Sequence, residues 1–245
     1  MSNKELKWYQ NKGLIIILSL LGIILILIIL FMIYFAKTVD NFQVEQLDPQ
    51  DQNAGAILLA ELKEQEKFED PTGKEINSPL LGATSSPRVT IVEFSDFNCP
   101  FSRESYLIMQ ELNKNYGEEI QLVFRNFPVT NEESLVLSIA AKCAQEQGFF
   151  PEMQRELFRH QGNLPLERLP DLAREIGMNM IEYNQCISAD KTEEEIIKDA
   201  EGGVEMGVRG TPSYFINGYK IEGDIPYEIF EILIEEILRE SDNNN

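Results

Sequence analysis

Cys99 is the residue in this sequence best placed to carry out chemistry. It follows Val89–Phe94, a run of β-branched and aromatic residues that predicts a buried strand. Pro100 comes directly after it and suits the first turn of a helix, where its missing N–H is not needed. We therefore expect Cys99 at a helix N-terminus, where unpaired N–H groups and the helix dipole favour a nucleophilic thiolate.

The sequence argues against a histidine-based catalytic site and against a metal site. His160 is the single histidine, which excludes a catalytic histidine pair and a histidine-rich metal site. The three cysteines, at positions 99, 143 and 186, lack the spacing of a zinc site. We expect neither a metal nor a cofactor. Because the number of cysteines is odd, at least one of them is left as a free thiol.

The elements around Cys99 predict an α/β fold. A helix continuing through residues 103–116 and a strand over 120–124 complete a βαβ unit with parallel strands. Residues 131–207 are expected to be helical throughout, as an inserted subdomain. Asn217-Gly218 between two short apolar runs predicts a β-hairpin, and a closing amphipathic helix is expected over 225–238.

A run of 23 uncharged residues, Leu14–Ala36, stands near the start of the chain. As a helix it would be about 34 Å long, enough to cross a hydrocarbon core of roughly 30 Å. It is too long for a cleaved signal peptide, so we expect an uncleaved signal-anchor and a single-pass cell-membrane protein. Three lysines and one acidic residue precede it, which predicts a cytoplasmic tail of residues 1–13 and an extracytoplasmic C-terminal domain.

The charge and the remaining segments limit the partners and the domain plan. The chain carries a net charge of −20, which argues against nucleic acid as a partner. Residues 37–77 are interpreted as a stalk, in which 54–68 can form a short amphipathic helix. That helix either packs on the domain or spaces it from the membrane. The domain itself is expected over 78–240, with a disordered tail over 241–245.

Three segments in this order resemble the DsbA-like branch of the thioredoxin superfamily. They are Ile91–Phe101 (IVEFSDFNCPF), Ala140–Phe150 (AAKCAQEQGFF) and Val208–Gly218 (VRGTPSYFING). The resemblance covers residues 78 to 238 and implies a thioredoxin fold interrupted by a helical subdomain. It also implies thiol-disulfide oxidoreductase activity on protein disulfides.

The resemblance further implies roles for residues around Cys99. Pro212 would be a cis-proline facing the cysteine, and Thr211 would offer its backbone to an incoming peptide. Glu93 matches the buried acid that handles protons beneath the active site, with a solvent-facing glutamate as the alternative. Pro100 and Phe101, beside the cysteine, are expected to contact the substrate.

The sequence departs from the family at position 102. The family motif is Cys-x-x-Cys, whereas this chain has Cys99-Pro-Phe-Ser102. Without a second sulfur, oxidase or reductase cycling between two cysteines is excluded at this site. Monothiol exchange remains open: Cys99 would form a mixed disulfide that an outside thiol releases. The Ser102 hydroxyl could donate a hydrogen bond to the Cys99 thiolate.

The other two cysteines have a separate role in the resemblance. DsbA-like relatives often carry a structural pair in such positions, so Cys143 and Cys186 are interpreted as a disulfide, with two buried free thiols as the alternative.

Three functions remain open from the sequence. The first is a membrane-anchored, extracytoplasmic thiol-disulfide oxidoreductase, with unfolded or cysteine-containing exported proteins and a small thiol reductant as its partners. The second is a non-catalytic peptide-binding or chaperone-like module with a degenerate active site. The third is a structural ectodomain that keeps only a relict of the site.

Overall fold

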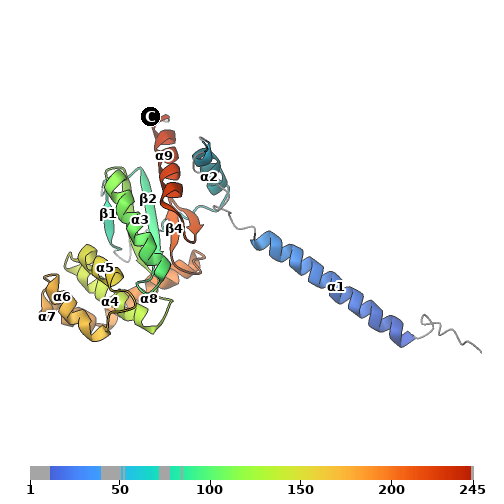
Figure 1. Cartoon of the computed structure of the whole chain (residues 1–245), viewed down its shortest axis with the longest axis horizontal. Coiled ribbons are helices and arrows are strands. Elements are labelled where there is room, and N and C mark those ends of the chain that lie inside the picture. The colour runs from blue at the N-terminus through green and yellow to red at the C-terminus, as the bar shows by residue number, and fades with distance from the viewer. Residues whose placement is uncertain (1–11, 40–50, 52, 72–77, 84, 244–245) are drawn as a thin grey trace, which may run out of the picture. The chain divides into compact units, whose positions relative to one another are not determined.

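The computed structural model describes residues 12–39, 51, 53–71, 78–83 and 85–243 (Figure 1). The chain divides into two compact units, Met1–Leu47 and Asp48–Asn245. Most of the predicted cytoplasmic tail and three parts of the predicted stalk, 40–50, 52 and 72–77, lie outside the described residues.

The first unit contains helix α1 (Lys12–Val39). Its side chains are described for residues 16–32, where the large apolar ones are about half exposed or more, from 48% at Leu18 to 62% at Phe31. Within the residues that the structure describes, no helix combines the length and the apolar character that crossing a membrane requires.

The second unit is built on a sheet with the strand order β1-β3-β2-β4-β5. The central strands β2 (Val89–Ser95) and β3 (Ile120–Asn126) are parallel, as the βαβ pattern predicted. The hairpin is also confirmed, with β4 (Ser213–Ile216) antiparallel to β5 (Tyr219–Glu222). The edge strand β1 (Leu80–Gly82) was not predicted, because three residues are too few to show an alternating pattern.

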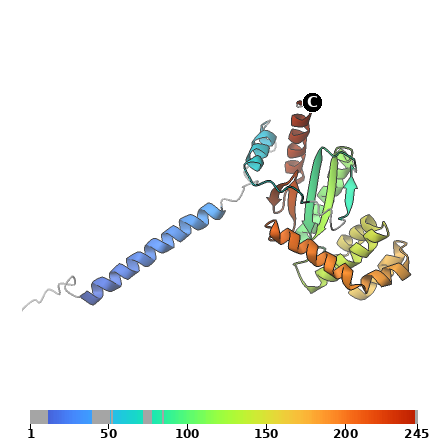
Figure 2. The same ribbon diagram turned by 180° about the vertical axis from the view of Figure 1, so that it is seen from behind.

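Helices cover both faces of this sheet (Figures 1 and 2). The βαβ crossover helix α3 (Pro100–Tyr116) and the last helix α9 (Tyr227–Asn243) lie on one face. Helix α8 (Asp190–Glu205) lies on the other, where Val92 and Phe94 of β2 are buried. A Cβ atom at Gly203 would come within 2.9 Å of the Phe94 ring, so glycine permits the close approach of α8.

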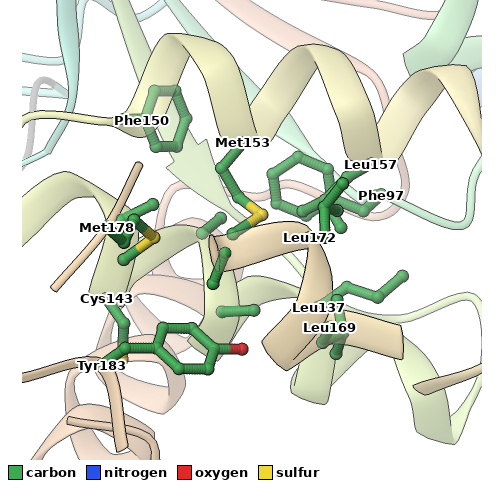
Figure 3. Packing of buried hydrophobic residues seen from close by; sticks show 14 of the residues in the cluster. Phe97, Leu137, Cys143, Phe150, Met153, Leu157, Leu169, Leu172, Met178 and Tyr183 are labelled. Carbon is green, nitrogen blue, oxygen red and sulfur yellow. The ribbon is translucent and has the colours of Figure 1, made fainter. Parts of the chain in front are cut away.

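The helical insert has its own core beside the sheet. It consists of α4 (Glu132–Glu146), α5 (Phe150–Arg159), the 3₁₀ turn η4 (Leu166–Arg168), α6 (Leu169–Glu175), α7 (Met180–Ile187) and α8. Figure 3 shows Met153, Leu157 and Leu172 among the side chains that meet in this core. Phe97, from the turn that precedes Cys99, is also part of it, so the active-site turn and the insert share one packed cluster.

The chain segment before the sheet also packs on this unit. Helix α2 (Ala54–Lys63) lies against α9 and buries Leu58, Leu59 and Leu62. Further along, Phe68 lies outside the helix and contacts the Phe215 ring edge-on, with 5.2 Å between centroids. This part of the predicted stalk therefore belongs to the unit that holds Cys99.

The C-terminal end also differs from the expectation. Helix α9 continues to Asn243, so residues 241–243 of the predicted disordered tail are helical, and the last two residues lie outside the described part. Two ion pairs hold this last part of the helix: Lys63 of α2 with Glu240 (2.5 Å) and Arg88 with Asp242 (2.5 Å). These long-range contacts are not visible in the local pattern of the sequence.

Candidate functional site

Cys99 lies where the turn after β2 meets the loop before β4. It is the N-cap residue of α3, with Pro100 in the first turn, as expected. Its side chain is nearly covered (7% exposed), and Sγ donates a hydrogen bond to the carbonyl oxygen of Thr211 at 3.1 Å. The Thr211–Pro212 peptide bond is cis. The structure therefore brings Cys99, Thr211 and Pro212 together.

Asp96 holds the turn that presents the cysteine. Its buried carboxylate accepts hydrogen bonds from the backbone N–H groups of Asn98, Val129 and Thr130, at 2.7 to 2.9 Å. Its carbonyl oxygen accepts from the N–H of Cys99 at 3.0 Å. The sequence analysis did not assign this role to Asp96, although an Asp before a turn often bonds the backbone two residues on, as it does here to Asn98.

Ser102 takes part in the same turn. It is fully buried, and its Oγ accepts a hydrogen bond from the N–H of Asp96 at 3.3 Å. Within the part of the chain that the structure describes, the Ser102 hydroxyl therefore bonds to Asp96 and not to Cys99 Sγ. Pro100 and Phe101 differ from Ser102 in that both are exposed, and Phe101 presents 52% of its surface beside the cysteine.

Glu93 lies inside the domain on β2, and not at the surface. Burial raises the pKa of Glu93 to about 7, and a hydrogen bond from Ser105 partly opposes that rise. The Ser105 hydroxyl donates to Glu93 Oε1 at 2.9 Å. A carboxyl group with this pKa can release or take up a proton near neutral pH, which is the property required of a proton-transfer group in thiol chemistry.

Tyr214 completes this buried polar chain. It is paired with Glu93 across β2 and β4, and its hydroxyl donates to Ser105 Oγ at 2.8 Å. Burial raises the pKa of Tyr214 well above its usual value, and the charge of Glu93 adds to the effect. Tyr214 therefore keeps its proton and continues to donate. Neither Ser105 nor Tyr214 was predicted, because their contact with Glu93 depends on strand register and helix placement.

Gln161 connects the insert to the active-site turn. Its side-chain Nε2 donates to the carbonyl oxygens of Phe97 (2.8 Å) and Cys99 (2.9 Å) from the loop after α5. These two bonds fix the backbone on either side of Asn98. No signal in the sequence distinguished Gln161, since it lies in a polar loop distant from Cys99 along the chain.

The remaining cysteines form a disulfide apart from this site. Cys143 on α4 and Cys186 on α7 are bonded, with Cα atoms 5.7 Å apart, which is the pairing that the resemblance implied. Both are buried in the insert. Cys99 is consequently the free cysteine of the chain.

The sheet order, the helical insert and a cysteine at a helix N-terminus beside a cis-proline define a thioredoxin fold of the DsbA-like kind. A family model described as thioredoxin matches residues 74–236, about two-thirds of the chain. The chain therefore belongs to the thioredoxin family.

Solved structures share this fold. Oxidised BdbD from Bacillus subtilis superposes with a TM-score of 0.62 at 20% identity, over 71% of this chain and all of that one. The thiol-disulfide exchange protein α-DsbA2 from Wolbachia pipientis gives 0.63 at 19% identity, over 77% of this chain and 100% of its own. The catalytic domain of Proteus mirabilis ScsC gives 0.61 at 20% identity, over 69% and 94%.

Curated relatives match a similar part of the chain. The Na⁺/H⁺ antiporter NhaA 1 of Mycobacterium sp. strain KMS is 31% identical over 148 residues, which are 59% of this chain and 24% of the relative. NhaA 1 of Salinispora arenicola is 30% identical over 151 residues, 61% of this chain and 23% of that protein. The chain thus spans about a quarter of the length of these relatives.

Proposed function

We propose that this protein is a thiol-disulfide oxidoreductase that acts on protein disulfides through the single sulfur of Cys99. The observation that carries the proposal is the position of Cys99 Sγ, at the N-terminus of α3 and 3.1 Å from the carbonyl oxygen of Thr211. A sulfur at a helix N-terminus is placed as reactive cysteines of thiol-exchange proteins are, and the loop beside it supplies backbone groups for an incoming peptide. The antiporter relatives share too little of their length to suggest ion transport here.

The exchange would proceed in two balanced steps. The Cys99 thiolate attacks one sulfur of a client disulfide, forming a mixed disulfide and releasing the other sulfur as a thiolate. Because Ser102 has no sulfur, an outside small thiol must then attack the mixed disulfide. That attack joins the small thiol to the client sulfur and restores the Cys99 thiolate. Glu93, with its pKa of about 7, is suited to take the proton that leaves the Cys99 thiol.

A trapping experiment tests this proposal. The full-length chain is incubated with a scrambled disulfide-containing protein and alkylated, and mixed disulfides are then identified by mass spectrometry with and without added small thiol. We expect an adduct at Cys99 that the small thiol removes, and no adduct in Cys99→Ala. A Cys99 that forms no adduct while a free cysteine peptide reacts would contradict the proposal.

The bonding of Ser102 favours a second candidate, a non-catalytic peptide-binding module. Its hydroxyl is engaged with the Asp96 N–H, so the fold is complete without a second sulfur. In that case, binding of an unfolded client persists in Cys99→Ala and is weakened when the Thr211–Pro212 loop is altered. Client binding measured by fluorescence anisotropy on both variants, together with the trapping result, separates the two functions.

We further infer that residues 14–36 anchor the protein in the cell membrane with the second unit outside. The uncharged run is longer than the stretch of α1 whose side chains are described, and the large apolar side chains of that stretch are exposed. A helix that is apolar all round is stable when lipid or protein surrounds it. Extraction of membranes at alkaline pH should leave the chain in the pellet, and protease added to intact spheroplasts should digest the second unit. Release into the soluble fraction would refute the anchor.

A further inference from the structure

A groove of about 610 Å³ lies beside Cys99, on the side of the helical insert. Asn98 and Pro100, the two neighbours of Cys99 in sequence, line one side of it. The start of α4 and the loop after α5 line the other side, with Glu133 and Asn163 among their residues. We call this feature the insert groove. It is distinct from the loop that carries Pro212, which does not line it.

The insert groove is fixed in position relative to the reactive sulfur. Gln161, which lines it, donates hydrogen bonds to the carbonyl oxygens of Phe97 and Cys99. At the start of α4, Asn131 Oδ1 accepts a hydrogen bond from Asn98 Nδ2 at 2.8 Å. The loop after α5 and the start of α4 are therefore both tied to the turn that presents Cys99, so a molecule held in the groove would have a defined position relative to Sγ.

The side chains that line the insert groove suit a polypeptide ligand. Four amide side chains line the groove: Asn98, Asn131, Gln161 and Asn163. Gln161 gives both Nε2 protons to the turn, and its Oε1 and the Asn163 amide can bond a ligand. Pro100, Leu164 and Pro165 add apolar surface, above Leu137 and Leu157. A lining with both amide and apolar side chains suits a peptide backbone with apolar side chains, and a volume of this size is typical of ligand sites.

The charge of the residues that line the insert groove indicates which ligand it can bind. Glu133 is the one charged side chain among the lining residues, and no lysine or arginine is found there. A small thiol that carries carboxylates would meet a carboxylate and no cation. We propose that the insert groove binds an uncharged or basic segment of the client polypeptide next to its cysteine. This inference deepens the proposed function and rests on it.

Binding of two short peptides to the full-length chain in non-ionic detergent tests the groove. Both carry serine in place of cysteine, flanked by apolar residues and by either lysines or glutamates, and their Kd values are measured by fluorescence anisotropy. The variant is Glu133→Lys. The matched control is Glu132→Lys, which makes the same change of charge in the same first turn of α4 but does not line the groove.

We expect Glu133→Lys to weaken binding of the lysine peptide about fivefold relative to Glu132→Lys, and to strengthen binding of the glutamate peptide. Asn163→Trp, which fills the groove, should weaken binding of both peptides. The inference would be overturned if Glu133→Lys and Glu132→Lys changed the peptide Kd values equally and Asn163→Trp left them unchanged. General electrostatics would then account for peptide binding.

A kinetic measurement separates this inference from the proposed function. The same variants react with a small uncharged aromatic disulfide, and the released thiolate is followed by absorbance. Rates equal to that of the unaltered chain, with altered peptide binding, support the groove. An unreactive Cys99 would refute the oxidoreductase, whereas the dependence of peptide binding on Glu133 would still establish the groove.

Discussion

At the scale of single residues, Glu93 is a buried group whose charge changes near neutral pH. Three hydroxyl or carboxyl side chains, Glu93, Ser105 and Tyr214, form a buried chain in which each hydroxyl donates toward the carboxyl group. Burial alone would hold Glu93 neutral, and the bond from Ser105 supports its charged form. The balance places its pKa at about 7, and this balance can be tested in two ways.

The first test is Glu93→Gln. The folded chain retains a proton on Glu93 between pH 4.5 and about 7, where the unfolded chain has released it. The stability that this proton confers is complete below the unfolded pKa and is lost as the pH rises through the folded one. Glutamine stays neutral and can still accept from Ser105. At about pH 8 the variant should therefore be more stable than the unaltered chain by about 3 kcal/mol.

At about pH 4 the two chains should unfold alike, because Glu93 is then protonated in both states. Urea unfolding followed by near-ultraviolet circular dichroism measures both differences. A gain in stability of equal size at both pH values would show that the effect comes from packing and not from ionisation.

The second test is Ser105→Ala. This change removes the hydrogen bond that stabilises the Glu93 carboxylate, so the pKa of Glu93 should rise above about 7, by roughly one further pH unit. A nuclear magnetic resonance titration of the Glu93 carboxyl carbon measures it. Tyr214→Phe, which leaves the Ser105 bond in place, should give a smaller rise. A lower pKa in Ser105→Ala would mean that the hydroxyl does not donate to the carboxylate.

At the scale of elements, the site is assembled from the ends of elements that are distant in sequence. The turn between β2 and α3 supplies Cys99, the loop before β4 supplies Thr211 and Pro212, and the loop after α5 supplies Gln161. Since Phe97 packs into the core of the insert, the stability of the insert also supports the active-site turn. Within the insert, the disulfide joins α4 to α7.

Removal of this disulfide should destabilise the domain without removing the reactive sulfur. Cys143 and Cys186 are separated by 43 positions, so the chain-entropy model predicts that Cys143→Ala/Cys186→Ala loses about 4 kcal/mol of unfolding free energy. Urea unfolding of the full-length chain measures the loss, with Cys99→Ala as the control that keeps the disulfide. A loss below about 1 kcal/mol would contradict a structural role for the bond.

At the scale of the whole molecule, the compact unit that holds Cys99 begins before the sheet. Helix α2 buries three leucines against α9, and a Cβ atom at Gly55 would lie 2.7 Å from the carbonyl oxygen of Ile232. The two helices therefore approach closely enough that α2 is part of the packed structure. Among the described residues, helix α2 and Phe68 are accordingly part of the packed unit and not a free connection.

Truncation tests this boundary. A chain that starts at Asp48 should unfold at the same urea concentration as the full-length chain. A chain that starts at Ser78 should lose at least about 4 kcal/mol, because the contacts of Leu58, Leu59 and Leu62 are absent. Near-ultraviolet circular dichroism reports the transitions. Equal stability of the two truncated chains would show that α2 contributes little to the unit.

The local features of this protein could be predicted from its sequence. The β-branched run before Cys99, the proline after it and the Asn217-Gly218 turn predicted β2, the start of α3 and the hairpin, and the structure confirms them. These predictions succeeded because capping, turn geometry and strand propensity depend on neighbours along the chain. The family motifs added the relation between Cys99 and Pro212, which propensity alone does not contain.

Which distant groups meet becomes visible only in the folded structure. The bonds of Gln161 to the active-site turn, the chain from Tyr214 through Ser105 to Glu93, and the packing of α2 on α9 each join segments far apart in sequence. No local pattern encodes such pairs, because they depend on strand register and on how helices fill space. The pKa of Glu93 belongs to the same group, since it is set by burial among those partners.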